Sequence, residues 1–277
     1  MPDLPLDSDL PLDSDLALAH QLADTADAIS ALRFRATDLI VTTKPDMTPV
    51  SDADQAVEMA IRGELAASRP EDSILGEEFG AEFGAVGNSR RQWIIDPIDG
   101  TANYVRGVPV WATLISLAID RVPVIGVVSA PALGSRWWAA TGGGAWMRDA
   151  DGERRIRVSA VSKLADASIS YNSIQQWDAH GHLDELIALS RQVWRTRAYG
   201  DMWSYMMLAE GLLDVAGEYD LQPYDMAALM PIVEEAGGRF TSMDGRPGPW
   251  HGSALATNSL LHEAVREAMN NAKRTRE

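Results

Sequence analysis

The sequence predicts a mixed α and β fold with layered sheets, and two observations support this prediction. Segments with apolar residues at helical spacing interleave with short runs of β-type residues along the whole chain. The 277 residues are 46% hydrophobic, which is enough to bury a sizeable core without disulfides or structural metals. Because no long linker interrupts the pattern, we expect one domain of two tightly joined lobes that meet at a cleft.

The N-terminal segment differs from the rest of the chain. Residues 5–16 repeat Pro-Leu-Asp-Ser-Asp-Leu twice, which is too short for a solenoid unit. The Asp-x-Asp pairs lack the glycine and distal glutamate of an EF-hand calcium loop. We therefore expect residues 1–15 to form a disordered acidic tail, followed by a single domain over residues 16–277.

The first half of the domain should begin with two helices. Apolar residues recur every three or four positions from Leu16 to Arg35, and a loop rich in turn formers follows. A second helix is expected from Asp52 to Ser68, with Ser51 or Asp52 as its N-cap. Beyond residue 70 the pattern changes to β-type runs, which we expect at 73–75, 93–95, 113–119, 122–130, 136–140 and 157–161.

The second half alternates between the two kinds of element, as is typical of a sheet covered by helices. We expect strands at 168–171, 215–218 and 239–242. We expect helices at 183–194, 201–213, 225–236 and 260–269.

Composition excludes several classes of function. The chain has 40 acidic and 24 basic residues, and its net charge of −16 argues against nucleic-acid binding. It has no cysteine, which excludes disulfides, thiolate zinc sites and cysteine nucleophiles. The first basic residue is Arg33, so a signal peptide is not expected, and no apolar run is long enough to span a membrane. We therefore expect a cytoplasmic protein without nucleic-acid or membrane partners.

The most informative segment for function is Trp-Ile-Ile-Asp-Pro-Ile-Asp-Gly-Thr at residues 93–101. Its apolar residues should form a buried strand that ends at Asp96, and Asp99 follows three residues later, so both side chains can face one point. Two carboxylates in this position suit Mg²⁺ better than zinc, which prefers nitrogen and sulfur. Gly100 and Thr101 would open a short helix whose free N–H groups can hold a phosphate.

Two further acidic segments strengthen this interpretation. Asp-x-x-Asp-Gly is a weak signal by itself, because aspartate and glycine are common in surface turns. However, Glu77 and Glu78 follow a short apolar run in the same way. Asp225 lies far downstream, just before a helix lined with small and apolar residues. The agreement of three segments favours one shared site over three unrelated turns.

With these motifs the chain resembles the inositol monophosphatase superfamily of Mg²⁺-dependent, lithium-sensitive phosphatases. The likeness extends from Leu16 to Met269, and the matching motifs occur in the family's order. They are Gly76-Glu77-Glu78, Asp96-Pro97-Ile98-Asp99-Gly100-Thr101 and Asp225-Met226-Ala227-Ala228. The resemblance implies a layered αβαβα sandwich of the inositol monophosphatase and fructose-1,6-bisphosphatase type. It implies a metal and phosphate lobe at about 16–155 and a substrate lobe at about 156–277.

The resemblance also implies roles for individual residues. Two or three Mg²⁺ ions would be ligated by Glu77, Asp96, Asp99, Asp225 and the carbonyl of Ile98. The expected catalytic residues are Glu77, Thr101 and Asp54, of which Asp54 matches an aspartate that reaches a metal through water. The alternative for Asp54 is an exposed carboxylate that the helix dipole favours in the first turn. The expected substrate-binding residues are Gly100, Thr101, Arg197, Asp201, Glu218 and Asp225.

The chemistry expected of such a site follows from its charges. Clustered Mg²⁺ would neutralise the phosphoryl oxygens, lower the pKa of bound water and stabilise the leaving alkoxide. Without cations the clustered carboxylates would repel each other. We expect hydrolysis of a small phosphate monoester by direct in-line attack of water, without a covalent phosphoenzyme.

Departures from the inositol branch predict the substrate. Where that branch usually has a small hydroxyl-bearing residue followed by alanines, this chain has Asp201, whose charge would pair with the ammonium and imidazole of histidinol phosphate. Leu229 stands where the inositol branch favours glycine. We therefore expect a histidinol-phosphate phosphatase activity, as in histidine biosynthesis. Inositol 1-phosphate and other small sugar or nucleotide phosphates are the alternative substrates, and Asp201 would serve equally well as a helix cap.

Two expectations concern the assembly and the possibility of lost activity. The family is commonly dimeric, so we expect a homodimer, with Trp111 and the pair Trp137 and Trp138 as candidates for the subunit contact. A non-catalytic metal-binding relative is a further alternative. The intact acidic motifs and Thr101 argue against it.

Overall fold

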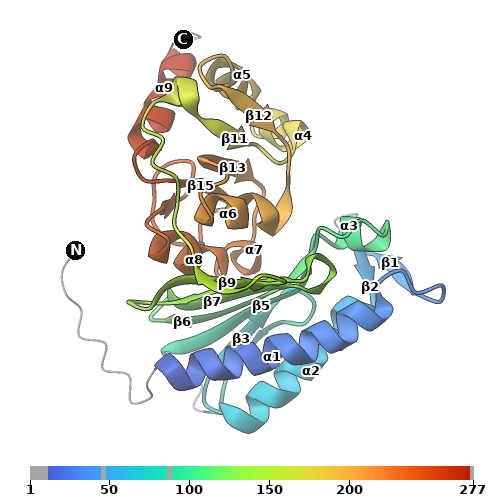
Figure 1. The fold of residues 1–277 in the computed structure, drawn as a ribbon. Coiled ribbons are helices and arrows are strands. Elements are labelled where there is room, and N and C mark those ends of the chain that lie inside the picture. The colour runs from blue at the N-terminus through green and yellow to red at the C-terminus, as the bar shows by residue number, and fades with distance from the viewer. Residues whose placement is uncertain (1–11, 45–47, 86–88, 275–277) are drawn as a thin grey trace.

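The computed structural model describes residues 12–44, 48–85 and 89–274, which form five stacked layers (Figure 1). Two sheets alternate with three layers of helices, and this confirms the expected αβαβα sandwich. The first layer contains α1 (Leu12–Arg33) and α2 (Asp52–Ser68). The middle layer contains α6 (Asp201–Ala209), α7 (Pro223–Met226) and α8 (Leu229–Glu235). The last contains α4 (Ile174–Ala179), α5 (Leu183–Ser190) and α9 (His262–Arg274).

The sheet beside α1 and α2 has eight strands in the order β10-β9-β8-β7-β6-β5-β3-β4. Every neighbouring pair is antiparallel except β3 and β5, which run parallel and therefore end at the same edge. The strands are β3 (Ser73–Gly76), β4 (Gly80–Glu82), β5 (Arg91–Asp99), β6 (Ala112–Ile119), β7 (Val122–Ala130), β8 (Ser135–Ala140), β9 (Gly144–Asp149) and β10 (Gly152–Arg155).

The second sheet has five strands in the order β12-β11-β13-β15-β14. Here β11 is parallel to β12 and β13, whereas β15 is antiparallel to β13 and β14. The strands are β11 (Ser168–Ser170), β12 (Arg195–Arg197), β13 (Val215–Tyr219), β14 (Arg239–Thr241) and β15 (Ser253–Thr257). A small hairpin, β1 (Val41–Thr43) and β2 (Pro49–Ser51), and the short helix α3 (Thr101–Val105) lie beside the first sheet (Figure 1).

The three largest apolar clusters of the described residues hold the layers together. Leu22, Ile61 and Trp93 belong to the core between the first helices and the first sheet. Trp137 and Met206 belong to the core around the middle helices. A third core covers the outer face of the second sheet. Burial of this apolar surface is the main favourable term in folding, since each large side chain contributes about 1.5–3 kcal/mol.

The middle layer touches the first sheet closely at one point. A Cβ on Gly126 in β7 would lie only 2.1 Å from the carbonyl oxygen of Ala228, so only glycine allows this approach. Beside it, the Ser116 hydroxyl is 3.1 Å from the carbonyl oxygen of Ala227. These contacts fix the segment that follows Asp225 against the first sheet, and they therefore help to position that aspartate.

The expected tail is partly wrong. Helix α1 begins at Leu12, and the side chain of Asp15 is fully buried. Asp15 accepts hydrogen bonds of 2.9 Å from Arg69 Nε and 2.8 Å from an Arg91 amino group, so it belongs to the folded domain. The preceding part of the expected tail, residues 1–11, lies outside the described residues.

Other differences from the sequence expectations have local causes. The segment 157–161 is not a strand; residues 144–155 instead form the hairpin of β9 and β10. The helix expected at 183–194 ends at Ser190, because the chain turns there to enter β12.

The expected subunit contact is wrong in its residues. The three tryptophans proposed for it are buried within the chain: Trp111, Trp137 and Trp138.

Candidate active site

The centre of the site is a group of three aspartates from the first sheet and the middle layer of helices. One carboxylate oxygen from each of Asp96, Asp99 and Asp225 lies within 4.8 Å of the other two. Strand β5 supplies the first two, and a break in its register between them allows both to reach the same point. Helix α7 of the middle layer supplies the third. Anionic oxygen donors at this spacing fit a hard divalent cation, which would compensate their charge.

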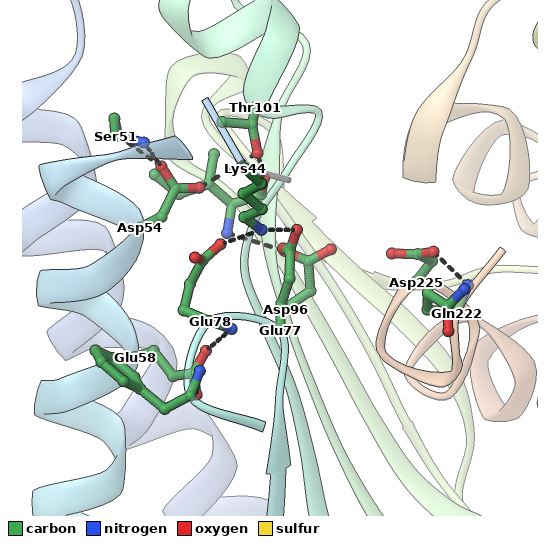
Figure 2. A network of polar contacts seen from close by, with 12 residues as sticks. Lys44, Ser51, Asp54, Glu58, Glu77, Glu78, Asp96, Thr101, Gln222 and Asp225 are labelled. Atoms are coloured by element: carbon green, nitrogen blue, oxygen red, sulfur yellow. Dashed lines mark hydrogen bonds and ion pairs between the residues drawn. The ribbon is translucent and has the colours of Figure 1, made fainter. Parts of the chain in front are cut away.

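Glu77 joins this group from the neighbouring strand. It follows β3, which is parallel to β5, and its N–H donates to the carbonyl of Ile95 at 3.2 Å. Figure 2 shows the side chains of Glu77 and Asp96 close together. The parallel pairing thus explains why two motifs about twenty residues apart converge.

The loop that carries Glu77 is anchored by a residue that the sequence did not indicate. The buried carboxylate of Glu58 accepts hydrogen bonds from the N–H groups of Glu78 at 2.7 Å and Phe79 at 3.2 Å (Figure 2). A Cβ on Gly76 would lie 1.9 Å from Glu58 Oε1, so glycine is required there. Glu58 looks like an ordinary surface glutamate of an amphipathic helix, and no sequence signal distinguishes it.

Asp54 is held beside Thr101 by the start of α2. Its Oδ2 accepts from the N–H of Ser51 at 2.8 Å and from the Ser51 hydroxyl at 2.6 Å, which forms a capping box. Its Oδ1 is 3.3 Å from the Thr101 hydroxyl, which also lies 2.9 Å from the carbonyl oxygen of Ile98. Asp54 is fully buried, so the alternative of an exposed carboxylate is wrong.

The electrostatics of the cluster disfavour the charged form of its carboxylates when no cation is bound. Burial, followed by the charges of Glu77, Asp99 and Asp225, raises the pKa of Asp96 well above its usual range. Burial and neighbouring carboxylates act on the pKa of Asp99 in the same direction. Burial raises the pKa of Asp225 to about 7. A divalent cation would reverse these shifts, because it favours the charged form of each carboxylate.

Lys44 is a second residue that the sequence analysis missed. Its ammonium lies 2.7 Å from Glu77 Oε1 and 2.7 Å from Glu78 Oε1 (Figure 2). Burial alone would lower the pKa of Lys44, but hydrogen bonds to the two glutamates raise it above its ordinary value. The available signal was a lone basic residue in the turn-rich loop just before β2, since the sequence has no other between Arg35 and Arg62.

A cavity of about 170 Å³ adjoins the aspartate group. Burial raises the pKa of Asp201 to about 6, and its Oδ2 accepts a 2.9 Å hydrogen bond from the amide of Asn103. Glu218 reaches the cavity from β13. The cavity is lined by Asp99, Asn172, Gln176, Asp201, Met202, Glu218, Asp220, Leu221, Asp225 and Leu229.

Gly100 is the N-cap of α3 and lies beside Asp201. It has φ +82°, and a Cβ there would lie 3.0 Å from the carbonyl oxygen of Val110 and 3.3 Å from Asp201 Oδ2. The helix-cap alternative for Asp201 is wrong: Gly200 is the N-cap of α6, and no side chain makes a capping hydrogen bond at this described end. Asp99 Oδ2 instead accepts from the N–H of Met202 in the first turn of that helix, at 2.7 Å.

Three of the expected substrate-binding residues do not line this cavity: Gly100 and Thr101 at the start of α3, and Arg197. Arg197 lies on the edge strand β12 with an exposed side chain, which donates to the carbonyl of Thr196 at 2.7 Å. Arg197 is not among the described residues that line the cavity.

Comparison with known proteins places the chain in a family. The profile of the inositol monophosphatase family matches residues 12–274. The chain belongs to the inositol monophosphatase family. It is 56% identical to the histidinol-phosphatase of Streptomyces coelicolor, over 91% of this chain and 95% of that protein. The histidinol-phosphatase of Mycobacterium tuberculosis is 54% identical, over 90% of this chain and 95% of that protein.

A solved structure of the family agrees with the fold. An inositol monophosphatase from Zymomonas mobilis superposes with a TM-score of 0.82 and 32% identity, over 94% of this chain and 99% of that chain. Family members are metal-dependent phosphatases, and the aspartate group described above is a cluster that could bind metal. Within the described part of the chain, no helix is both long enough and apolar enough to cross a membrane.

Proposed function

We propose that this protein hydrolyses histidinol phosphate to histidinol and phosphate, a step of histidine biosynthesis, with two or three Mg²⁺ ions per site. The observation that carries the choice of substrate is the presence of further carboxylates in the cavity, of which Asp201 and Glu218 are withdrawn from solvent. Neither belongs to the close group of three aspartates. The 56% and 54% identity to two proteins named histidinol-phosphatase supports the same choice.

The charge of the cavity suits a cationic leaving group. Histidinol carries an ammonium and an imidazole that titrates near neutral pH, and both can pair with carboxylates. An uncharged polyol would gain little from Asp201 and would leave this partly buried charge without a partner. Among the described residues that line the cavity none is basic, so a cationic substrate would meet no opposing charge there.

The proposed metal ligands are those expected from the family likeness. Side chains from both lobes would contribute, and the donor set consists only of oxygen, which fits Mg²⁺. The proposed ligands are Glu77, Asp96, Asp99, Asp225 and the carbonyl of Ile98. When bound, the ions would supply the positive charge that the phosphoryl group and the leaving alkoxide require.

The protein's own groups would orient the water. The Thr101 hydroxyl and Asp54 Oδ1, 3.3 Å apart, can hold a water molecule between the cluster and the start of α3. Burial raises the pKa of Asp54, which makes it a better proton acceptor than an exposed aspartate. The water oxygen forms the new bond to phosphorus, the bond from phosphorus to the ester oxygen breaks, and the leaving alkoxide takes up a proton. Hydrolysis in ¹⁸O-water should therefore place the label in phosphate, and label in histidinol would contradict this route.

The test of the substrate is a comparison of kcat/KM for four phosphate esters. These are histidinol phosphate, inositol 1-phosphate, fructose 1,6-bisphosphate and 3′-phosphoadenosine 5′-phosphate, each with and without Mg²⁺. We expect histidinol phosphate to be preferred by at least about tenfold, the ratio that ~1.4 kcal/mol of extra transition-state binding produces. A preference for inositol 1-phosphate would overturn the proposed substrate, and no turnover of any ester would overturn the proposed activity.

The role of Asp201 has its own test. Asp201→Ser should raise KM for histidinol phosphate at least about tenfold, since loss of a hydrogen bond to a charged group costs ~1.5–3 kcal/mol and each ~1.4 kcal/mol is a factor of ten. Asp166→Ser makes the same substitution at an exposed position of the same lobe and should leave KM unchanged. If Asp201→Ser hydrolyses histidinol phosphate as well as the parent does, Asp201 does not recognise the cation.

We also propose, from the family likeness alone, that the protein is a cytoplasmic homodimer. The proposed lobes are a metal and phosphate lobe at residues 16–155 and a substrate lobe at 156–277, with Arg197 kept as a proposed substrate contact. Light scattering on a size-exclusion column should give twice the 30.1 kDa chain mass. A mass of one chain would contradict the dimer.

A further inference from the structure

Glu218 is held by two hydrogen-bond donors that come from different parts of the chain. The hydroxyl of Tyr205 donates to Glu218 Oε1 at 2.8 Å. The side-chain amide of Asn172 donates to the other oxygen, Oε2. With one donor on each oxygen, the plane of the carboxylate is fixed and not free to rotate.

The two donors are themselves rigid. Tyr205 lies in α6, is 1% exposed, and packs against Phe240 with ring centroids 5.8 Å apart. Asn172 has φ +53°, a left-handed conformation that asparagine tolerates better than most residues. Its Oδ1 would lie 2.9 Å from a Cβ on Gly200, so the amide fills the space beside that glycine. Neither donor can easily reorient.

The surroundings of Glu218 oppose its ionisation. Burial raises the pKa of Glu218 to about 8, and the charges of Asp201 and Asp225 add to this, while hydrogen bonds from Tyr205 and Asn172 lower it. The other charged groups lining the cavity are also acidic, Asp99 on β5 and Asp220 after β13. The charged groups that face Glu218 are therefore all acidic and disfavour its charged form. The neutral donors Tyr205 and Asn172 act in the opposite direction and favour it.

We propose that Tyr205 and Asn172 are positioning residues for substrate specificity, which orient the Glu218 carboxylate so that it pairs with the cationic part of the substrate. This inference rests on the proposed function, because it assigns Glu218 to the organic part of the ester. It goes further in explaining how the cavity holds this carboxylate in one orientation, with two hydrogen bonds that favour its charged form.

The main test is Tyr205→Phe, which keeps the ring and removes only the donor. We measure kcat/KM for histidinol phosphate and for p-nitrophenyl phosphate, whose leaving group carries no cation. The ratio of the two values should fall about tenfold, mainly through KM for histidinol phosphate, because a hydrogen bond to a charged group is lost. The acidic limb of the kcat/KM profile for histidinol phosphate should also move to higher pH, since Glu218 would ionise less readily.

Matched variants separate positioning from general damage. Tyr199→Phe removes a hydroxyl from a neighbouring half-buried tyrosine that packs on Trp203, and it should leave the ratio unchanged. Asn172→Gly keeps the left-handed backbone, removes the second donor and should lower the ratio in the same direction as Tyr205→Phe. In the double variant Tyr205→Phe with Glu218→Gln, the loss should not exceed that of Glu218→Gln alone, because the hydroxyl acts through Glu218.

The results distinguish two failures. If Tyr205→Phe lowers kcat/KM for both esters equally, or leaves the pH profile in place, the residue is merely structural and the inference is wrong. If the parent protein itself does not prefer histidinol phosphate, the proposed function fails first. Thermal unfolding of each variant shows whether a loss of rate reflects loss of folded protein.

Discussion

Gly76 allows a sharp test of how the loop that carries Glu77 is held. Gly76→Ala would place a Cβ 1.9 Å from Glu58 Oε1, far inside contact distance. The side chain of Glu58 is fully buried and is held by Arg62 Nε at 2.8 Å as well as by two backbone N–H groups. It has little room to move away, so its hydrogen bonds to the loop should break.

The expected cost follows from those hydrogen bonds. Two bonds from backbone N–H groups to a buried carboxylate contribute about 1.5–3 kcal/mol each, so their loss costs about 3–6 kcal/mol. Alanine recovers ~0.4–1 kcal/mol by restricting the unfolded chain. We therefore expect a net loss of roughly 2–5 kcal/mol in the free energy of unfolding. Weaker metal binding should accompany it, since Glu77 adjoins the displaced loop.

A matched substitution provides the control. Gly63 lies inside α2, and a Cβ added there would have no heavy atom within 4 Å, so Gly63→Ala should stabilise the protein by about 1 kcal/mol. Urea unfolding gives both free energies, and calorimetric titration with Mg²⁺ gives the metal affinity. If Gly76→Ala were as stable as the parent, the anchoring role of Glu58 would be refuted. Should Gly76→Ala fail to fold at all, Glu58→Gln makes the milder test of the same contacts.

Three further predictions follow from burial and close packing. Asp15→Asn should lower the free energy of unfolding in urea by about 3–5 kcal/mol, because two arginines lose a buried partner. Asp13→Asn, at an exposed position, should change it by less than ~0.5 kcal/mol. Equal effects would mean that Asp15 does not stabilise the folded domain. Burial raises the pKa of Asp225 to about 7 and of Glu218 to about 8, above their unfolded values. The metal-free folded protein then binds more protons at these groups than the unfolded chain does. Its Tm, measured in chelator, should therefore decrease as the pH is raised from about 5 to about 9, and Mg²⁺ should restore it. A Tm independent of pH would contradict this. Gly126→Ala should lower both Tm and Mg²⁺ affinity, and an unchanged affinity would show that this contact does not position Asp225.

The sequence predicted the acidic motifs of the site because their geometry is local. Asp96 and Asp99 are placed by one strand and its end, and an apolar run followed by carboxylates reports this directly. Glu58 and Lys44 were missed because their roles depend on packing between elements far apart in the chain. The residues next to Glu58 and Lys44 in the sequence do not indicate which distant segment each side chain contacts in the folded protein.

The same distinction explains the elements. Helix α2 was predicted with the observed bounds, since its periodicity and N-cap are local signals. Strand β15 was missed because Ser-Ala-Leu-Ala-Thr is rich in alanine, which has low β propensity, and its pairing with β13 and β14 forms only in the complete sheet. The start of α1 was placed too late because the repeated acidic residues look solvated, although Asp15 is paired with two distant arginines.

The capping boxes have a consequence for the evolution of inactive relatives. Asp54 and Asp225 each accept a hydrogen bond from the backbone N–H that opens their helix, at 2.8 Å and 2.6 Å. These bonds satisfy a backbone donor at the start of each helix, so folding as well as turnover favours both residues. Burial nevertheless raises the pKa of both, and for Asp96 the charges of three neighbouring carboxylates add to burial when no cation is bound. A relative that no longer binds metal would therefore be expected to replace Asp96 early.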